Sequence, residues 1–357
     1  MLVGVRIAGL ALLLSLTGCI DPIDFAIGEP ERRLVVDATL TDGPGPHVVR
    51  LNWPGGFQGL DALRPPARNA VVEVRDGQGN VYPAAEQSPG RYVIPEGALV
   101  AQVGGSYSLH VRIEDGRSYS SAPQQMPEPG EMASVQPSYE RLPRLVGGVL
   151  AEIPSITIRL DASTDASEPA FLRWTWTGTW ETEFCATPTI PTCFACWISE
   201  AGRSLVQIAE TPLTSGQPLI GQLAAVFPLP EEPERFAHGF AVTVQQESMT
   251  QDAFRFWHRI REQRDAVGSL FDAPAGNVWG NMVNDDDPED FTFGYFTVSS
   301  TRSETVCMRI SDFPDRDPIT MHGRFIVPNA PQACAATPGG AQTPPPGFLT
   351  LCGRPGG

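Results

Sequence analysis

Apolar and polar residues alternate along much of the chain, and this pattern predicts short β-strands. Ala70 to Arg75 alternates and then meets the turn dipeptide Asp76-Gly77. Tyr107 to Ile113 alternates in the same way before the polar turn at Glu114 to Arg117. Turns spaced roughly ten residues apart are typical of β-sandwiches. We therefore expect residues 32–122 to form an N-terminal sandwich of the immunoglobulin-like or transthyretin-like kind.

The same pattern returns later in the chain and predicts a second β-rich domain over residues 149–328. Its candidate strands are 156–160, 172–176, 240–244, 291–298 and 306–310. The proline- and glutamate-rich stretch 123–148 reads as a linker or a long crossover between the two domains. Residues 329–357 form a tail rich in proline and glycine. The fold class is therefore mainly β, with two domains.

One segment departs from the strand pattern and predicts an amphipathic helix over residues 249–264. Ser248 with Gln251 matches a capping box at the start of this helix. One helical face carries only apolar side chains, which we interpret as a face packed on a sheet: Met249, Ala253, Phe256, Trp257 and Ile260.

Composition supports a turn-rich β protein and excludes several functions. The 357 residues include 35 Gly and 35 Pro, and 41% are hydrophobic, which is enough for a sizeable core. The 41 acidic and 25 basic side chains give a formal net charge of −16. This balance disfavours nucleic acid as a partner. Every one of the basic residues is arginine, so chemistry that needs lysine is excluded.

The amino terminus has the organisation of a bacterial lipoprotein signal peptide. Arg6 supplies a short basic region, Ile7 to Leu16 an apolar region, and Thr17-Gly18 precede Cys19. We expect residues 1–18 to be removed and Cys19 to become acylated, and several acyl chains give a stable anchor. Residues 19–31 then form a polar tether. The acidic body would be repelled by anionic lipid, so the acyl chains must hold the protein at the membrane.

Apart from Cys19, the cysteines number six, and an even number in an exported chain predicts disulfide bonds. Cys185, Cys193 and Cys196 lie in one short segment, where at least one local bond is expected. A bond between Cys334 and Cys352 would tie down the tail, although the connectivity is open. Zinc is an alternative at Cys193-x-x-Cys196, but no second C-x-x-C is present.

Two further groups are candidates for ligand binding. The acidic run Asn284 to Asp290 includes Asp285, Asp287 and Glu289, which could supply oxygens to calcium although the run lacks the EF-hand order. The alternative is a solvated acidic turn. Even spacing places Trp174, Trp176 and Trp180 on one strand face, where they could fill the core or stack against a glycan or peptide.

Enzymatic motifs are missing from the chain, so we expect no catalysis. The five histidines are dispersed without an H-E-x-x-H pair, and no G-x-S-x-G elbow occurs. Its glycine-rich loops do not precede a helix, as a phosphate-binding loop would. Apart from calcium, the sequence therefore suggests no cofactor.

An ordered set of short motifs along nearly the whole mature chain resembles a family of lipoproteins, found mostly in Bacteroidota, called "domain of unknown function 4249". The set begins with the Cys19 segment and Asp21 and Asp24, and continues through Leu34 to Asp37, Ala70 to Val74, Gly105 to Leu109, Asp115 to Ser120, Cys196-Trp197, the aromatic helix, Gly276 to Val278 and Gly294 to Phe296. The resemblance implies an outer-membrane lipoprotein, often encoded beside a TonB-dependent transporter, with no established activity.

These expectations together describe an acylated outer-membrane accessory or binding protein that works with such a transporter. The sequence leaves open which face of the membrane it occupies and whether the ligand is a small molecule, a glycan or a peptide. A structural or adhesive surface lipoprotein is the first alternative, and an extracytoplasmic hydrolase is the second.

Replacing Cys19 by alanine tests the anchor. We expect the Cys19→Ala protein to move from the membrane fraction to the soluble fraction, because no acyl chain can then be attached. Fractionation followed by immunoblotting measures this change. Continued sedimentation of the variant with membranes would show that the anchor assignment is wrong.

Overall fold

The computed structural model describes residues 33–54, 65–163, 170–186, 193–202, 207–210, 218–265, 278–319, 324–327 and 330–353. The expected signal peptide, Cys19, the tether and Gly276-Asn277 lie outside the described residues. All described residues belong to one compact unit. No helix in the described ranges is long and apolar enough to cross a membrane. The fold is mainly β, as the alternating pattern predicts.

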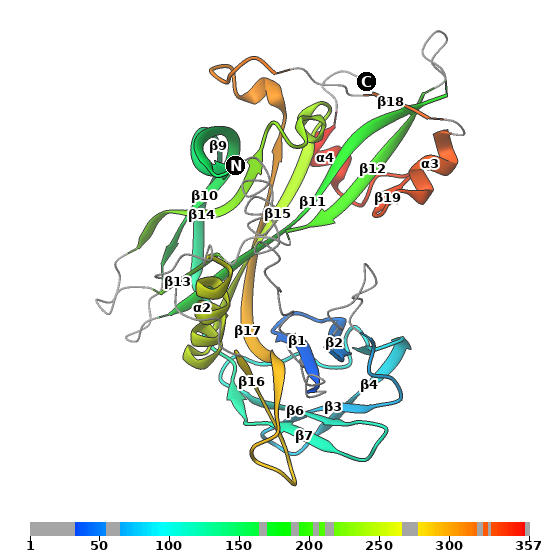
Figure 1. Ribbon diagram of the computed structural model, residues 1–357, viewed down its shortest axis with the longest axis vertical. Helices are drawn as coiled ribbons and strands as arrows, with labels where there is room; N and C mark the ends of the chain where they lie inside the picture. Colours follow the sequence, from blue (N-terminus) through cyan, green and yellow to red (C-terminus); the bar gives the residue numbers. More distant parts are fainter. Residues whose placement is uncertain are drawn as a thin grey trace, which may run out of the picture. The chain divides into compact units, whose positions relative to one another are not determined.

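The N-terminal strands form a closed, barrel-like sheet (Figure 1). Hydrogen-bonded strands follow one another in this sheet in the order β1-β2-β5-β4-β3-β6-β7-β16-β17. Strand β17 also pairs with β1, in parallel, and this pairing closes the sheet. The strands are β1 Val35–Thr41, β2 His47–Asn52, β3 Val71–Asp76, β4 Val81–Ser88, β5 Arg91–Ile94, β6 Ser106–Arg112, β7 Ser118–Ser121, β16 Trp279–Asn284 and β17 Phe291–Met308. The two-residue strand β8 Gln124–Gln125 pairs with β6.

Alternate residues of these strands point inward and fill the closed sheet with one apolar core. β1 contributes Val36, Ala38 and Leu40, and β17 contributes Phe296 and Val298. Strands β3, β5 and β6 add their own buried alternate positions, as period-two patterning requires.

The remaining strands extend this sheet from β17 and add a second one. β17 also pairs with β15, which pairs with β11, and β11 pairs with β12, β13 and β18. These strands are β11 Phe171–Cys185, β12 Cys193–Ala201, β13 Gln207–Glu210, β15 Phe240–Met249, β18 Arg324–Ile326 and β19 Gly340–Ala341, which pairs with β12. The separate sheet is β14-β10-β9, formed by β9 Glu131–Val146, β10 Val149–Ser163 and β14 Leu219–Pro228.

Strand β17 differs from the sequence-based prediction. Residues 291–298 and 306–310 were expected to form two strands, but Phe291–Met308 is one continuous strand. Its polar middle is largely buried at Thr297, Ser299 and Ser300. Between the two predicted strands lie Ser299 to Thr305, and backbone pairing of this stretch with β15 keeps it in the sheet.

The segment 123–148, expected as a linker or a long crossover, has secondary structure of its own. It contains β8 and β9, and β9 pairs with β10 along its length through a turn at Gly147-Gly148. Strands β16 and β17, from the expected second domain, complete the closed sheet of the N-terminal strands. The two expected domains therefore share strands.

The predicted helix is present as α2, Gln251–Asp265, and its predicted apolar face is confirmed. Ala253 and Phe256 pack with Tyr295 of β17, and Trp257 and Ile260 flank them. The predicted capping box is wrong, because Ser248 ends strand β15 and its hydroxyl accepts a hydrogen bond from the Gly130 N–H at 2.8 Å. Thr250 caps the helix instead and accepts from the Ala253 N–H at 3.3 Å.

Three disulfide bonds join the six cysteines, but not in the pairing that would tie the tail to itself. Cys185–Cys193 is the expected local bond. Cys334 bonds to Cys196, 138 residues away, and Cys352 bonds to Cys307. The tail, with short helices α3 Ala330–Ala336 and α4 Phe348–Cys352, is thus fastened to strands β12 and β17. Two short 3-10 turns, η1 Pro233–Phe236 and η2 Ile310–Asp312, complete the elements.

The pairing of β17 with β1 depends on a glycine, which gives a test of the fold. Gly294 has φ +77°, and a Cβ there would collide with the carbonyl oxygen of Val36 on β1. We expect Gly294→Ala to lower the free energy of unfolding by about 2–4 kcal/mol, because backbone strain and a backbone collision add together. Urea unfolding followed by circular dichroism measures the change.

A matched control separates the collision from the strain. Gly79 has a similar φ of +88° but open space where a Cβ would lie. Gly79→Ala should therefore cost only the strain, about 1 kcal/mol. Equal losses in the two variants would contradict the role assigned to the close approach at Val36.

Candidate functional site

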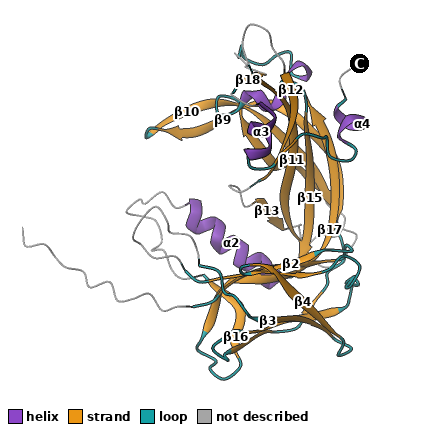
Figure 2. Cartoon of the chain, turned by 90° about the vertical axis from the view of Figure 1, so that its right-hand side faces the viewer, coloured by secondary structure: helices purple, strands orange, loops and turns teal. Residues whose placement is uncertain are grey.

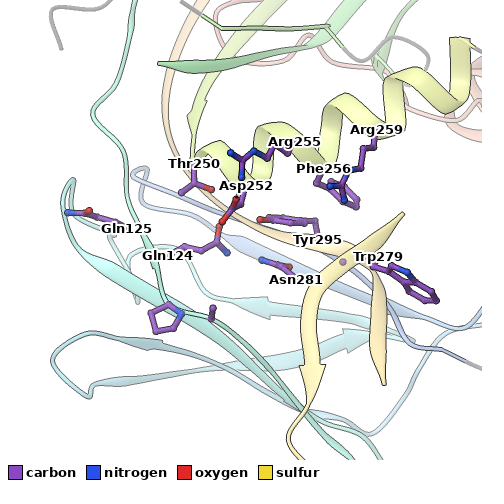
Figure 3. A pocket seen from close by; sticks show the side chains of 13 residues that line it. Gln124, Gln125, Thr250, Asp252, Arg255, Phe256, Arg259, Trp279, Asn281 and Tyr295 are labelled. Atoms are coloured by element: carbon purple, nitrogen blue, oxygen red, sulfur yellow. Dashed lines mark hydrogen bonds and ion pairs between the residues drawn. The ribbon is translucent and has the colours of Figure 1, made fainter. Parts of the chain in front are cut away.

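A cavity of about 450 Å³ lies beside the first turns of α2 and is the best candidate for a functional site (Figure 3). Segment 122–125, including β8, forms one side, α2 another, and β16 and β17 the floor. The lining is mostly polar and consists of Ala122, Pro123, Gln124, Gln125, Thr250, Asp252, Arg255, Phe256, Arg259, Trp279, Gly280, Asn281 and Tyr295.

Gln124 supplies an unused hydrogen-bond acceptor to this cavity. Its side chain is 9% exposed, and its Nε2 donates to the carbonyl oxygen of Phe296 at 2.7 Å. That bond fixes the orientation of the amide, because a flipped amide would place two oxygen atoms together. Oε1 is then buried without a hydrogen-bond partner. A buried acceptor in this state costs free energy unless a ligand or water donates to it.

Asn281 fixes the floor of the cavity. Its Nδ2 donates to the Phe296 carbonyl oxygen at 2.8 Å, and its Oδ1 accepts from the Phe296 N–H at 2.9 Å. The register of β16 against β17 shifts between Trp279 and Val283, and the Asn281 side chain replaces ladder bonds at this irregularity. Gly280 is required beside it, because a Cβ would collide with the carbonyl oxygen of Gly294.

Tyr295 lies below the start of α2 with its ring against Phe256, the centroids being 4.8 Å apart. Burial, followed by the negative charge of Asp252, raises the pKa of Tyr295 to about 12. The phenol therefore stays protonated at neutral pH and remains both a donor and an acceptor. Asp252 itself is exposed, and in Figure 3 its side chain and that of Gln124 point toward one another.

Two arginines one helical turn apart line the opening. Arg255 pairs with Asp252 at 3.2 Å, and both side chains are exposed. Arg259 makes no hydrogen bond or ion pair within the described ranges. An unpaired guanidinium beside a cavity is suited to a carboxylate or phosphate. The site thus offers acceptors near Gln124 and a cation near Arg259.

The tryptophans proposed as a stacking platform lie in the core instead. Trp174 is 2% exposed and its Nε1 donates to Gln246 Oε1 at 2.9 Å. Trp176 packs edge-on against Phe227, and Trp180 is 9% exposed. All three pack in the core between the extended sheet and β14-β10-β9. The stacking hypothesis is therefore wrong, and the alternative of core filling is correct.

The acidic run proposed for calcium forms a turn between β16 and β17. Asp285, Asp287 and Glu289 are not among the described groups whose ligand atoms gather within 4.8 Å of one another. The Asp287 carboxylate instead accepts from the Glu289 N–H at 3.0 Å. The structure does not bring these carboxylates to one point, so the solvated-turn interpretation is favoured.

The zinc alternative at Cys193 and Cys196 is also wrong, because each sulfur is bonded to a different cysteine. In the described part of the chain, the one cluster of three potential metal ligands is Glu183, Cys185 and Cys193. Two of its three ligand atoms form the Cys185–Cys193 disulfide, which removes the thiolates that a metal needs.

A second cavity, of about 470 Å³, is lined by His110 and Ser120, whose arrangement resembles a base and a nucleophile. On β6, Nε2 of His110 lies 3.0 Å from Ser108 Oγ and its Nδ1 lies 2.9 Å from Ser120 Oγ. Burial, together with the charge of Arg75, lowers the pKa of His110. Both ring nitrogens are occupied by hydroxyls, so no described carboxylate orients the ring as hydrolytic triads require.

Sequence reasoning missed the residues of the first cavity. Gln124 lies in the supposed linker, and Asn281 and Tyr295 belong to no motif that names a chemistry. The signal that was available is the resemblance segment Gly294 to Phe296, which contains Tyr295, and the polar face of the predicted helix, which contains Arg255 and Arg259. Their meeting depends on strand pairings that no local pattern reveals.

Comparison with known families gives a match over most of the chain. The model of the family described as Domain of unknown function (DUF4249) matches residues 20–305, which include every residue lining the cavity. A search of curated proteins finds no match to the chain.

The coupling between Asp252 and Tyr295 can be tested by titration. Asp252→Asn should lower the pKa of Tyr295 from about 12 but leave it above 10.0, because burial is the larger cause and remains. Tyrosinate absorbance against pH measures the shift, with Tyr295→Phe identifying the signal. Because the folded-state pKa is raised, the stability contributed by Tyr295 is complete below pH 10 and is lost as the pH rises through about 12.

Asp265→Asn, at the other end of the same helix, is the matched control. It should leave the Tyr295 titration unchanged. An unchanged titration in Asp252→Asn as well would show that Asp252 does not act on this phenol.

Proposed function

We propose that this chain, which belongs to the DUF4249 family, is a non-catalytic binding protein anchored in the outer membrane by acylated Cys19. In this proposal the closed-sheet region acts as an immunoglobulin-like or transthyretin-like module that carries the site. The protein works as an accessory to a TonB-dependent transporter, to which it supplies a captured ligand.

The buried, unpartnered Oε1 of Gln124 is the observation that carries the binding hypothesis. Gln124 lines a polar cavity of about 450 Å³, a size typical of small-molecule sites, which are roughly 300–1,000 Å³. The cavity lining contains no serine, cysteine or histidine, and its one carboxylate, that of Asp252, is paired with Arg255. Binding therefore explains this set of side chains better than catalysis.

The side chains also define the chemical class of the ligand. A donor group, such as an ammonium or a hydroxyl, would satisfy Gln124 Oε1 close to the Asp252 carboxylate. An anionic group would pair with Arg259 at the opening. A small molecule with a donor at one end and a carboxylate at the other, such as an amino acid or a short peptide, meets both conditions.

The alternatives make different predictions. A structural or adhesive lipoprotein would bind no small ligand and would not associate with a transporter. A hydrolase that used the described serine–histidine arrangement would employ Ser108 or Ser120 with His110, whose ring has no orienting carboxylate among the described residues. Because the chain has no lysine, cross-linking to a transporter needs a photoreactive residue rather than an amine-reactive reagent. Recovery of the protein without any transporter barrel would contradict the accessory role.

Ligand binding is tested with a panel of free amino acids and dipeptides. We expect at least one compound to raise the melting temperature of the purified chain, because a ligand that binds only the folded state stabilises it. Arg259→Ala should lower the affinity for that compound by about 10-fold or more, since a charge-assisted hydrogen bond is lost. Isothermal titration calorimetry measures the affinities.

Arg68→Ala is the control, because Arg68 is an exposed arginine outside the cavity lining. Its affinity should equal that of the unmodified chain. Gln124→Met keeps a similar side-chain volume but removes the acceptor. It should lower the affinity most for compounds that carry an ammonium or hydroxyl donor. Equal affinity in Arg259→Ala and Arg68→Ala, or no stabilising compound at all, would contradict the proposed site.

A further inference from the structure

The hairpin of β9 and β10 extends beyond the third strand of its sheet. Strand β14 pairs with β10 only from Ser155 to Ala162, whereas β9 and β10 continue to pair as far as Val146 and Val149. Figure 2 shows the two strands running out together to their turn. Among the described strands, residues 141–152 therefore form a two-stranded ribbon that no third strand extends.

The end of this ribbon, residues 145–150, is apolar although it is exposed. We name these residues the hairpin tip. The exposed fractions are 58% for Leu145, 53% for Val146, 68% for Val149 and 67% for Leu150. The turn between them is Gly147-Gly148, so the tip contains no polar side chain. Exposed aliphatic residues gathered in one place mark a contact surface.

Both faces of the tip are apolar. Val146 lies opposite Val149, and Leu145 lies opposite Leu150 in the register of the two strands. Because successive residues of a strand point to opposite faces, the valine pair covers one face and the leucine pair the other. A protein groove would cover one face of such a ribbon, whereas hydrocarbon surrounds both.

The first charged side chain next to the tip belongs to the strand pair that directly follows Leu145 and Leu150. Arg144 lies opposite Ala151, and Glu152 lies opposite Pro143. Arg144 forms an ion pair with Glu231, and Arg141 one with Asp317. An arginine at this position can extend its guanidinium to lipid phosphates while its aliphatic stem follows the apolar residues. The apolar length from Arg144 to the turn is about 10 Å, at roughly 3.3 Å per residue.

We propose that the hairpin tip inserts shallowly into the lipid bilayer, as a second membrane contact separate from the acyl anchor. Its apolar length matches the depth of roughly 5–10 Å at which interfacial segments lie. Val146 pairs with Val149 beside the turn, and so shallow a position keeps the outward-facing backbone groups of the ribbon at the hydrated headgroup boundary rather than in the hydrocarbon core. The net charge of −16 opposes adsorption to anionic lipid, so such a contact must be made by aliphatic side chains.

This contact would set how the protein stands on the membrane. An acyl anchor on a tether leaves the orientation of the body free, whereas a second contact at a fixed place on a folded sheet restricts it. The inference rests on the proposed acyl anchor but does not use the ligand cavity or the transporter, so its failure would leave those two parts of the proposed function untouched.

Depth-dependent fluorescence quenching tests the proposal in the full acylated chain. The protein is reconstituted in vesicles of phosphatidylethanolamine and phosphatidylglycerol whose acyl chains are brominated or unbrominated. A Val149→Trp variant reports the position of the tip. Val81→Trp is the matched control, because Val81 follows a hairpin turn and is 49% exposed. Subtracting the quenching of the unmodified chain removes the signal of its own tryptophans.

We expect the added tryptophan in Val149→Trp to be quenched by brominated lipid at least two-fold more than the one in Val81→Trp. Adding Leu145→Asp and Leu150→Asp to Val149→Trp should abolish the excess, because the opposite face of the tip becomes charged. All three positions are exposed, so these changes leave the core intact. Equal quenching of the two probes would overturn the proposal. The proposal would also be overturned if a photoreactive residue at position 149 cross-linked to another protein while Val149→Trp showed no excess quenching by lipid.

Discussion

The fold depends on the close approach of β17 to β1, strands from opposite ends of the chain. Their parallel pairing aligns Val36 with Gly294, where the absence of a side chain lets the two backbones meet. This contact closes the N-terminal sheet around its core. The same strand continues into pairing with β15, so one element holds both parts of the molecule. Parallel pairing between such distant segments has a large loop-closure cost, and the shared apolar core offsets it.

The candidate site follows from that arrangement. Strand β17 carries Tyr295, its neighbour β16 carries Asn281, and α2 begins two residues after the end of β15, the other neighbour of β17. Gln124 arrives from the segment after β7, which pairs with β16. Each residue stands on or beside a strand of the shared sheet, which gives the rigid positioning that a binding site needs.

The outer parts of the protein are held by different means. The tail has few buried residues, and the bonds Cys196–Cys334 and Cys307–Cys352 attach it to strands of the sheet. Such bonds limit the freedom of the unfolded chain, by a larger amount for longer loops. The β9–β10 hairpin has no covalent support at its tip and no third strand there. An isolated two-stranded ribbon is marginally stable in water, which is consistent with a partner surface for the tip.

Local pattern determined the mainly β class, the apolar face of α2 and the number of disulfide bonds, because each depends on neighbouring residues or on a count. Local pattern gave wrong predictions where pairing with a distant segment decided the structure. Ser248 matches a helix cap, yet pairing with β11 and a bond to Gly130 keep it in a strand. Only the tertiary structure decided the disulfide partners of Cys334 and Cys352 and the closure of β1 on β17. It also decided that Gln124 and Arg259 line the same cavity. Register and packing between remote strands set those contacts, and they leave no periodic signal along the chain.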